Sequence, residues 1–271
     1  MRTIILAWDL NEDGRHAADI AFELARVYGA RLFLLYVAVE GVMSADRVRQ
    51  RLESEITRRV RAGGDSGAEN RCEAVVRPGD FPEGVTDFAR EVKADLVVFG
   101  PNRRGGTRTT LLGTSPERVL RGARTSVLIV PGPLEIPPRS ILVPVGRVQG
   151  STDLDLVRDW FISQGVEEVL VLQVSAYASP AYRKPQILPA EDVSLQLGLS
   201  EGADSGPVLR IETWSAPTVK EGILSAVEKA DPSLVVMRTS PEGLLGRIAF
   251  GSVASEVCRV IDRPLLLTPP P

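Results

Sequence analysis

Short apolar runs alternate with longer amphipathic stretches along the whole chain. This alternation is typical of repeated βαβ units, and it predicts a mostly parallel sheet with helices on both faces. In the first half, the runs that read as strands are residues 3–8, 31–37, 71–76, 95–99 and 126–130. Apolar residues at helical spacing predict helices over about residues 14–28 and 45–61, with two shorter helices around residues 85–92 and 119–120.

The second half of the chain repeats the first. Residues 96–131 run parallel to residues 234–269 at an offset of 138, and residues 3–9 and 31–37 match residues 140–146 and 168–174 at an offset of 137. A repeat of this length is a duplicated domain, so each half is expected to close its own core. We therefore predict two domains, residues 1–134 and 139–271, joined by a linker that its prolines stiffen.

One segment departs from the repeat. Where the first half has the charged, arginine-rich helix at residues 45–61, the second half has residues 176–207, which are rich in Pro, Ser, Gly and Ala. We predict that this segment is partly irregular, with at most a short helix near residues 191–197, and its role stays open. The arginines of the first-half helix form either a solvated face or a docking surface for an acidic partner.

Composition narrows the class of protein. A formal charge of -3 and a pI near 5.5 provide no basic field, so nucleic acid is not an expected partner. The two cysteines, Cys72 and Cys258, make neither a disulfide framework nor a metal cluster, which fits a reduced cytoplasmic setting. The first apolar run is too short for a signal peptide, and we expect no membrane span.

A candidate phosphate-binding loop follows the fourth predicted strand of the first half. It begins at Gly100 and runs to Gly113, after which Thr114 and Glu117 form a capping box at a helix start. The unpaired amides and the dipole of such a start favour an anion. In a doubly wound sheet the ligand crevice lies at the carboxyl ends of the strands, where Asp9 is also expected. Alternatively, the glycines are only turns and the box is only a cap.

With these residues in view, the chain resembles a tandem universal stress protein. The resemblance rests on Val-Val-Phe-Gly at residues 97–100, on Gly-Thr thirteen residues later, and on related residues at the matching positions of the second half. It implies an α/β fold of two Rossmann-like doubly wound domains, each with a five-stranded parallel sheet of order 3-2-1-4-5, packed as a pseudo-dimer. It also implies a stress-response regulator more than an enzyme, and in many members a bound adenine nucleotide.

Carried over by position, the resemblance assigns a nucleotide site to the first half. Asp9 would hold the ribose, the glycines and the following helix start would hold phosphates, and Ala7, Trp8 and Val37 would line the adenine. The candidate binding residues are Ala7, Trp8, Asp9, Val37, Gly100, Arg103, Gly105, Gly113, Thr114 and Ser115. Arg103 replaces the second glycine of the family motif, so it either crowds the phosphates or contacts them.

The second half departs further from the motif. Gly146 replaces the aspartate and Arg238 the first glycine, whereas the helix start is kept. The surviving candidates there are Gly251, Ser252 and Val253. Losing one charged hydrogen bond costs about 1.5–3 kcal/mol, so we predict that the second site is empty or altered.

The leading hypothesis is a cytoplasmic regulator that binds ATP, ADP or AMP mainly in the first half, with or without Mg²⁺, and acts on an unknown protein partner. Asp9 is the candidate metal ligand, together with phosphates. The alternative is a nucleotide-free interaction protein of the same fold with both sites degenerate. A slow ATPase comes third, because the sequence offers no identifiable base or water-positioning residue. The only histidine, His16, is not expected to belong to a catalytic triad, since no nucleophile elbow is present. Whether two chains form a homodimer stays open.

Overall fold

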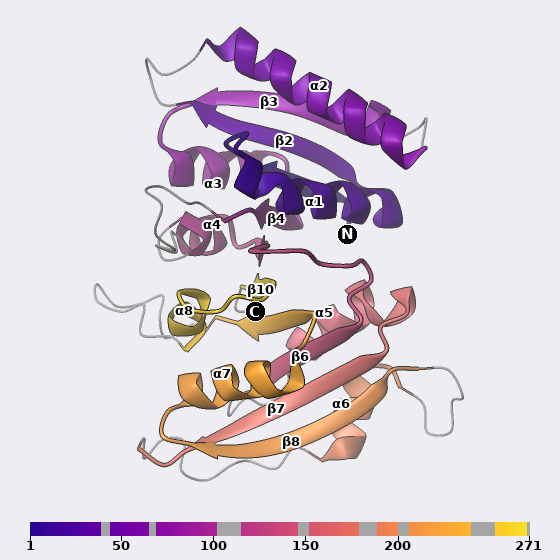
Figure 1. Ribbon diagram of the computed structural model, residues 1–271, viewed down its shortest axis with the longest axis vertical. Coiled ribbons are helices and arrows are strands. Elements are labelled where there is room, and N and C mark those ends of the chain that lie inside the picture. The colour runs from indigo at the N-terminus through magenta and orange to yellow at the C-terminus, as the bar shows by residue number, and fades with distance from the viewer. Residues whose placement is uncertain are drawn as a thin grey trace. The chain divides into compact units, whose positions relative to one another are not determined.

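The structure is a computed structural model, and it describes residues 1–38, 44–64, 69–101, 115–145, 152–178, 189–199, 206–239 and 253–269. The chain divides into two compact units, Met1–Pro133 and Leu134–Pro271, and each is described by itself (Figure 1). Within the described residues, no helix is both long enough and apolar enough to cross a membrane.

The first unit is built on a five-stranded parallel sheet. Its strands are β1 (Thr3–Ala7), β2 (Arg31–Ala38), β3 (Cys72–Pro78), β4 (Leu96–Phe99) and β5 (Ser126–Ile129). Their pairing gives the order β3-β2-β1-β4-β5, which confirms the order 3-2-1-4-5 expected for this half. The central strands carry apolar residues on both faces, and Ile4, Ile5 and Leu6 are fully buried. Such two-sided burial is what a parallel sheet between helix layers requires.

Helices cover both faces of this sheet. They are α1 (Arg15–Tyr28), α2 (Ala45–Gly63), α3 (Phe81–Glu91) and α4 (Ser115–Ala123), with the 3₁₀ turns η1 (Glu12–Gly14) and η2 (Glu69–Arg71). Because crossovers between parallel strands are right-handed, α1 and α2 lie on one face, and α3 and α4 pack together on the other. Helix α2 buries an apolar stripe at four-residue spacing, formed by Val48, Leu52, Ile56 and Val60.

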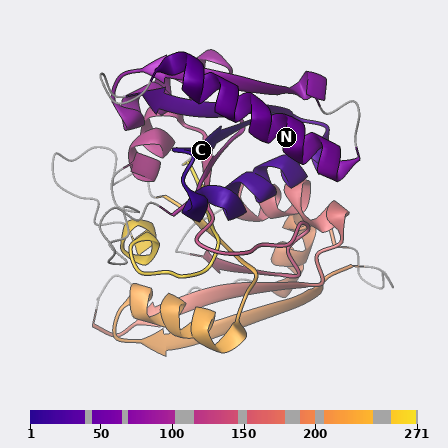
Figure 2. The same cartoon turned by 45° about the horizontal axis from the view of Figure 1, so that its top comes forward.

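The second unit repeats this plan. Its strands are β6 (Ser140–Val145), β7 (Glu168–Ala176), β8 (Val208–Ala216), β9 (Leu234–Arg238) and β10 (Leu265–Thr268), in the order β8-β7-β6-β9-β10. Its helices are α5 (Thr152–Trp160), α6 (Ala190–Gln196), α7 (Val219–Ala230) and α8 (Val253–Cys258), with the 3₁₀ turn η3 (Ile162–Gln164). Figures 1 and 2 show α7 lying along β7 and β8. The short helix expected near residues 191–197 is present as α6.

Candidate functional site

The carboxyl ends of β1 and β4 form an apolar wall. Ala7 is in register with Leu35 of β2 and with Phe99 of β4, so the three side chains point to the same face of the sheet. Val37 lies two residues beyond Leu35 and therefore on the same face. Phe81, the first residue of α3, packs edge-on against Phe99, with ring centroids 6.0 Å apart. The structure thus brings together two predicted site residues, Ala7 and Val37, on the α3 side.

Phe99 and Phe81 complete this wall, and the sequence reasoning did not find them. Phe99 is 4% exposed and directly precedes Gly100 at the end of β4. Its signal in the sequence is its place next to the candidate loop. Phe81 carries a weaker signal, because only its position at a helix start after Gly79 and Asp80 marks it.

Asp9 lies in the turn between β1 and η1, and its carboxylate is already held in place. One carboxylate oxygen accepts a hydrogen bond from the Asn11 backbone N–H at 3.2 Å, and the other accepts one from Asn11 Nδ2 at 2.7 Å. Asn11 in turn caps η1, because its Oδ1 accepts a hydrogen bond from the Gly14 N–H at 2.9 Å. Each carboxylate oxygen has two lone pairs, so the exposed Asp9 can still accept hydrogen bonds from a ligand.

Gly100 stands where β4 meets the start of the first helix, and its lack of a side chain is required there. A Cβ on Gly100 would lie 2.8 Å from the Gly14 Cα, and a Cβ on Gly14 would lie 2.5 Å from Trp8 Nε1. Real Cβ atoms do not approach other heavy atoms this closely, so alanine at Gly100 would displace the Gly14 backbone and alanine at Gly14 would displace the Trp8 indole. Gly100 therefore has a packing role that holds whether or not a ligand binds beside it.

Trp8 is not part of the apolar wall. Successive residues of a strand point to opposite faces, so the indole of Trp8 lies on the side opposite Ala7. It is 5% exposed, and its Nε1 donates a hydrogen bond to the Asn11 carbonyl oxygen at 3.2 Å. Only the backbone of Trp8 therefore lies beside the apolar wall, while its ring packs against other elements of the first unit, and its role in lining an adenine stays a prediction.

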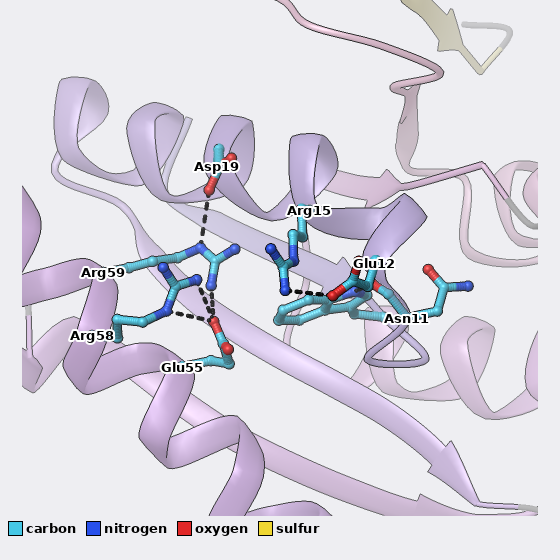
Figure 3. Close-up of polar contacts among 8 residues, drawn as sticks. Asn11, Glu12, Arg15, Asp19, Glu55, Arg58 and Arg59 are labelled. Atoms are coloured by element: carbon cyan, nitrogen blue, oxygen red, sulfur yellow. Dashed lines mark hydrogen bonds and ion pairs between the residues drawn. The ribbon is translucent and has the colours of Figure 1, made fainter.

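The ring of Trp8 faces a buried arginine. The Arg59 guanidinium carbon lies 5.2 Å from the Trp8 ring centroid and 5.6 Å from that of Phe22. Arg59 also forms ion pairs with Glu55 and, at 3.2 Å, with Asp19 on α1 (Figure 3). Its side chain is only 7% exposed, and a cation–π contact in such a setting contributes about 0.5–2 kcal/mol.

The charges around Glu55 show that this cluster favours the ionised carboxylate. Burial alone would raise the pKa of Glu55, but the hydrogen bond from Arg58 and the positive charges of Arg59 and Arg58 outweigh it. The pKa of Glu55 is therefore held below its usual value. Figure 3 shows Arg58 and Arg59 converging on Glu55 from the same helix, α2.

Comparison with known proteins identifies this arrangement. The model of the universal stress protein family matches the chain twice, over residues 1–131 and 138–269. The chain belongs to the universal stress protein family. A universal stress protein of Thermus aquaticus is 30% identical over 136 residues, which are 48% of this chain and 98% of that protein. One of Methanocaldococcus jannaschii is 24% identical over 143 residues, which are 49% of this chain and 83% of that protein.

Solved structures share the fold over the whole chain. A universal stress protein from Archaeoglobus fulgidus DSM 4304 matches 98% of this chain and 98% of its own, with a TM-score of 0.70 and 17% identity. A protein from Pseudomonas aeruginosa PAO1 matches 100% of this chain and 93% of its own, with a TM-score of 0.66 and 16% identity. These matches show the tandem α/β fold, and the family membership expected from the sequence is confirmed.

Several predicted site residues of this family member lie outside the described residues. They are Arg103, Gly105, Gly113, Thr114, Gly251 and Ser252. The predicted capping box falls there as well, because it includes Thr114. Ser115 and Val253 are placed as the first residues of α4 and α8, which are the helix starts that the family motif would use.

The first unit offers a metal ion few ligands of its own. Within the described residues, no group of three or more His, Cys, Asp or Glu side chains is arranged to hold a metal. Glu12 is paired with Arg15 at 2.8 Å, and His16 is exposed on α1. Asp9 can give a magnesium ion one carboxylate, so the remaining ligands would have to be phosphate oxygens and water, as is usual for this ion.

The equivalent strand ends of the second unit are built differently. Pro144 takes the place of Ala7, and Arg238 takes the place of Gly100 at the end of β9. The ladder between β6 and β9 pairs two residues on each strand, whereas that between β1 and β4 pairs four. Proline has no N–H to donate, which explains why this ladder does not continue through Pro144.

Proposed function

We propose that this universal stress protein is a regulator that binds an adenine nucleotide, ATP, ADP or AMP, in its first unit. The observation that carries the proposal is the placement of Asp9 beside the wall of Ala7, Val37 and Phe99. A carboxylate fixed by Asn11 suits ribose hydroxyls, and a flat apolar wall suits a base. These residues lie at the ends of β1, β2 and β4, and strand order reverses between β1 and β4, which is where doubly wound sheets bind ligands.

The second unit is proposed not to bind nucleotide in the same way. It has Gly146 in place of the carboxylate, and Arg238 brings a long cationic side chain to the position of Gly100. In the first unit, a Cβ on Gly100 would already lie 2.8 Å from the Gly14 Cα, so a side chain as long as arginine would not be accommodated in a turn of the same shape. The expected stoichiometry is therefore one nucleotide per chain.

The test begins with mass spectrometry of the small molecules released by acid denaturation of the purified protein. Isothermal titration with ATP, ADP and AMP then compares wild type with Asp9→Ala. Loss of one charged hydrogen bond costs about 1.5–3 kcal/mol, so the affinity of Asp9→Ala should fall by about tenfold or more. Asp87→Ala is the matched control, because Asp87 is an exposed acid of the same unit that pairs only weakly with Arg90, at 3.6 Å.

Three outcomes would count against the proposal. If wild type releases no nucleotide and its melting temperature does not shift with millimolar ATP, the nucleotide-free alternative replaces it. Two nucleotides per chain would contradict the assignment to the first unit. Equal affinities for wild type and Asp9→Ala would remove Asp9 from the site. Adding Mg²⁺ to the ATP titration measures whether the metal takes part in binding. The protein partner and any pairing of units or chains remain predictions.

A further inference from the structure

Arg59 is a buried charge whose neighbours come from three different segments of the first unit. It extends from α2, contacts Phe22 and Asp19 of α1, and faces the ring of Trp8 after β1. Its guanidinium is almost withdrawn from water, with 7% of the side chain exposed. A cation held by two carboxylates and two aromatic rings is confined to a narrow set of positions, and so is the indole that it faces.

A continuous path of contacts leads from this arginine to Asp9. The indole that Arg59 faces donates its Nε1 proton to the Asn11 carbonyl oxygen. Asn11 donates both its backbone N–H and its side-chain Nδ2 proton to the Asp9 carboxylate. The side chain of the same asparagine accepts a hydrogen bond from the Gly14 N–H and so caps η1. Asn11 is thus hydrogen-bonded to both Trp8 and Gly14, the two ends of this turn.

The backbone of this turn needs such support. Leu10 has a φ of 63°, in the left-handed region that non-glycine residues rarely adopt, and its side chain is buried at 8% exposure. A leucine persists there only where its surroundings fix the conformation. Trp8 and Asn11 flank Leu10 on either side, so contacts that fix them also fix the direction in which Asp9 points.

We propose that Arg59 is a positioning residue for Asp9. By holding the Trp8 indole, it fixes the β1–η1 turn and links helix α2 to the nucleotide site. The inference rests on the proposed function for its effect on ligand binding, but its effect on the turn does not depend on any ligand.

Arg59→Met separates positioning from stability. Removing one partner of a buried ion pair is costly because it leaves the other charge buried and uncompensated, so the apolar variant is tolerable where the remaining charges stay satisfied. That condition is met, because Glu55 keeps its ion pair with Arg58 and the side chain of Asp19 is 63% exposed. Arg58→Met is the matched control, since the neighbouring Arg58 binds the same Glu55 but is 60% exposed and does not face Trp8.

The first measurement uses the protein without nucleotide. The chain has three tryptophans, so the Trp8 indole N–H signal in a ¹⁵N spectrum can be assigned with Trp8→Phe. Arg59→Met should shift this signal and the Asn11 side-chain amide signals and speed their exchange with solvent, while the melting temperature stays near that of wild type. Arg58→Met should leave both sets of signals unchanged. Unchanged Trp8 and Asn11 signals in Arg59→Met would overturn the proposal.

The second measurement compares ATP with 2′,3′-dideoxy-ATP, which lacks the hydroxyls that Asp9 would hold. Arg59→Met should bind ATP about tenfold more weakly than wild type, the size of one misdirected charged hydrogen bond, and should bind dideoxy-ATP as wild type does. ATP should also protect the α2 amides from hydrogen exchange in wild type but not in Arg59→Met, because coupling between sites is reciprocal.

The two measurements tell apart the failure of each claim. An equal loss for ATP and dideoxy-ATP would overturn the positioning role, since it would indicate a general disturbance of the unit. If wild type binds neither nucleotide while the Trp8 and Asn11 signals respond to Arg59→Met, the proposed function fails and the role of Arg59 in the turn stands.

Discussion

The two units share a packing contact in the core, whereas an ion pair on their surfaces has opposite polarity in the two copies. A Cβ on Gly84 of α3 would lie 3.0 Å from a methyl of Val37, and a Cβ on Gly222 of α7 would lie 2.4 Å from a methyl of Val174. These are the same contact in the two copies, between the second strand and the third helix. The helix thus approaches the sheet closely at a glycine in both units, and the approach is closer at Gly222 than at Gly84.

Ion pairs at equivalent positions have opposite polarity. Arg31 on β2 pairs with Glu73 on β3 at 3.7 Å, and at the matching positions Glu168 on β7 pairs with Arg210 on β8 at 2.9 Å. The first unit has 20 basic and 18 acidic residues, whereas the second has 12 and 17, so their formal charges are +2 and -5. The pairing of the strands thus brings these two positions together in both units, but it does not determine which of them carries the positive charge and which the negative charge.

Among the residues that the structure describes, the two units differ in the helix that follows their second strand. Helix α2 has 19 residues and contacts β2 and β3, whereas α6 at the same point of the repeat has 7. Leu52 of α2 is fully buried, but Leu195 of α6 is 78% exposed. One copy thus uses a long amphipathic helix with four buried residues as part of its core, and the other uses a short helix that buries Val193 and leaves Leu195 in solvent.

Truncating these two leucines should show the largest difference between the units. Leu52→Ala removes a fully buried side chain and leaves a cavity, so we expect the free energy of unfolding of the first unit to fall by about 2–5 kcal/mol. Leu195→Ala should change that of the second unit by less than about 0.5 kcal/mol. Amide hydrogen exchange read by mass spectrometry follows each unit separately. Similar losses in both variants would show that Leu195 contributes as much to the stability of its unit as Leu52 does.

The paired glycines test whether the shared contact is equally tight. Gly222→Ala places a methyl 2.4 Å from Val174, so we expect it to destabilise the second unit by about 1–3 kcal/mol, as overpacking does. Gly84→Ala meets Val37 at 3.0 Å, and the higher helix propensity of alanine, about 1 kcal/mol, should offset most of the cost. Urea denaturation measures both. A larger loss for Gly84→Ala would mean that the first unit is the less adaptable copy.

Much of this comparison could be predicted from the sequence. The alternation of apolar runs placed the strands to within one or two residues, and the four-residue spacing of the stripe from Val48 to Val60 marked the buried face of α2. The candidate site was predicted less completely. The contact of Arg59 with Trp8 joins residues 51 positions apart, and the left-handed φ of Leu10 has no local signal, because both follow from how separate elements meet.

The starts of α3 and α7 differ in capping, since a side-chain cap is formed at α7 and not at α3. Thr218 and Glu221 make a complete capping box, whereas Asp80, at the matching position, makes no side-chain cap hydrogen bond. The matching Glu83 is paired with Arg118 of α4 instead. Thr218→Ala should therefore lower stability by about 1 kcal/mol, and Asp80→Ala by less than about 0.5 kcal/mol. The shift in the urea midpoint of each variant measures this, and equal shifts would indicate that Asp80 caps α3 in solution.

The two ion pairs of opposite polarity should give the smallest effect on stability. They test whether it matters which of the two positions carries the positive charge. Both pairs are largely exposed, and exposed pairs contribute only about 0.2–1 kcal/mol. Glu73 is in register with Phe33, so Arg31→Glu places two glutamates diagonally across β2 and β3. It should destabilise the first unit by about that amount, more at low salt than at high salt. Adding Glu73→Arg gives the first unit the polarity of the second, and the double variant should recover the stability of wild type. Failure to recover would mean that the surroundings, and not the pair alone, choose the sign in each unit.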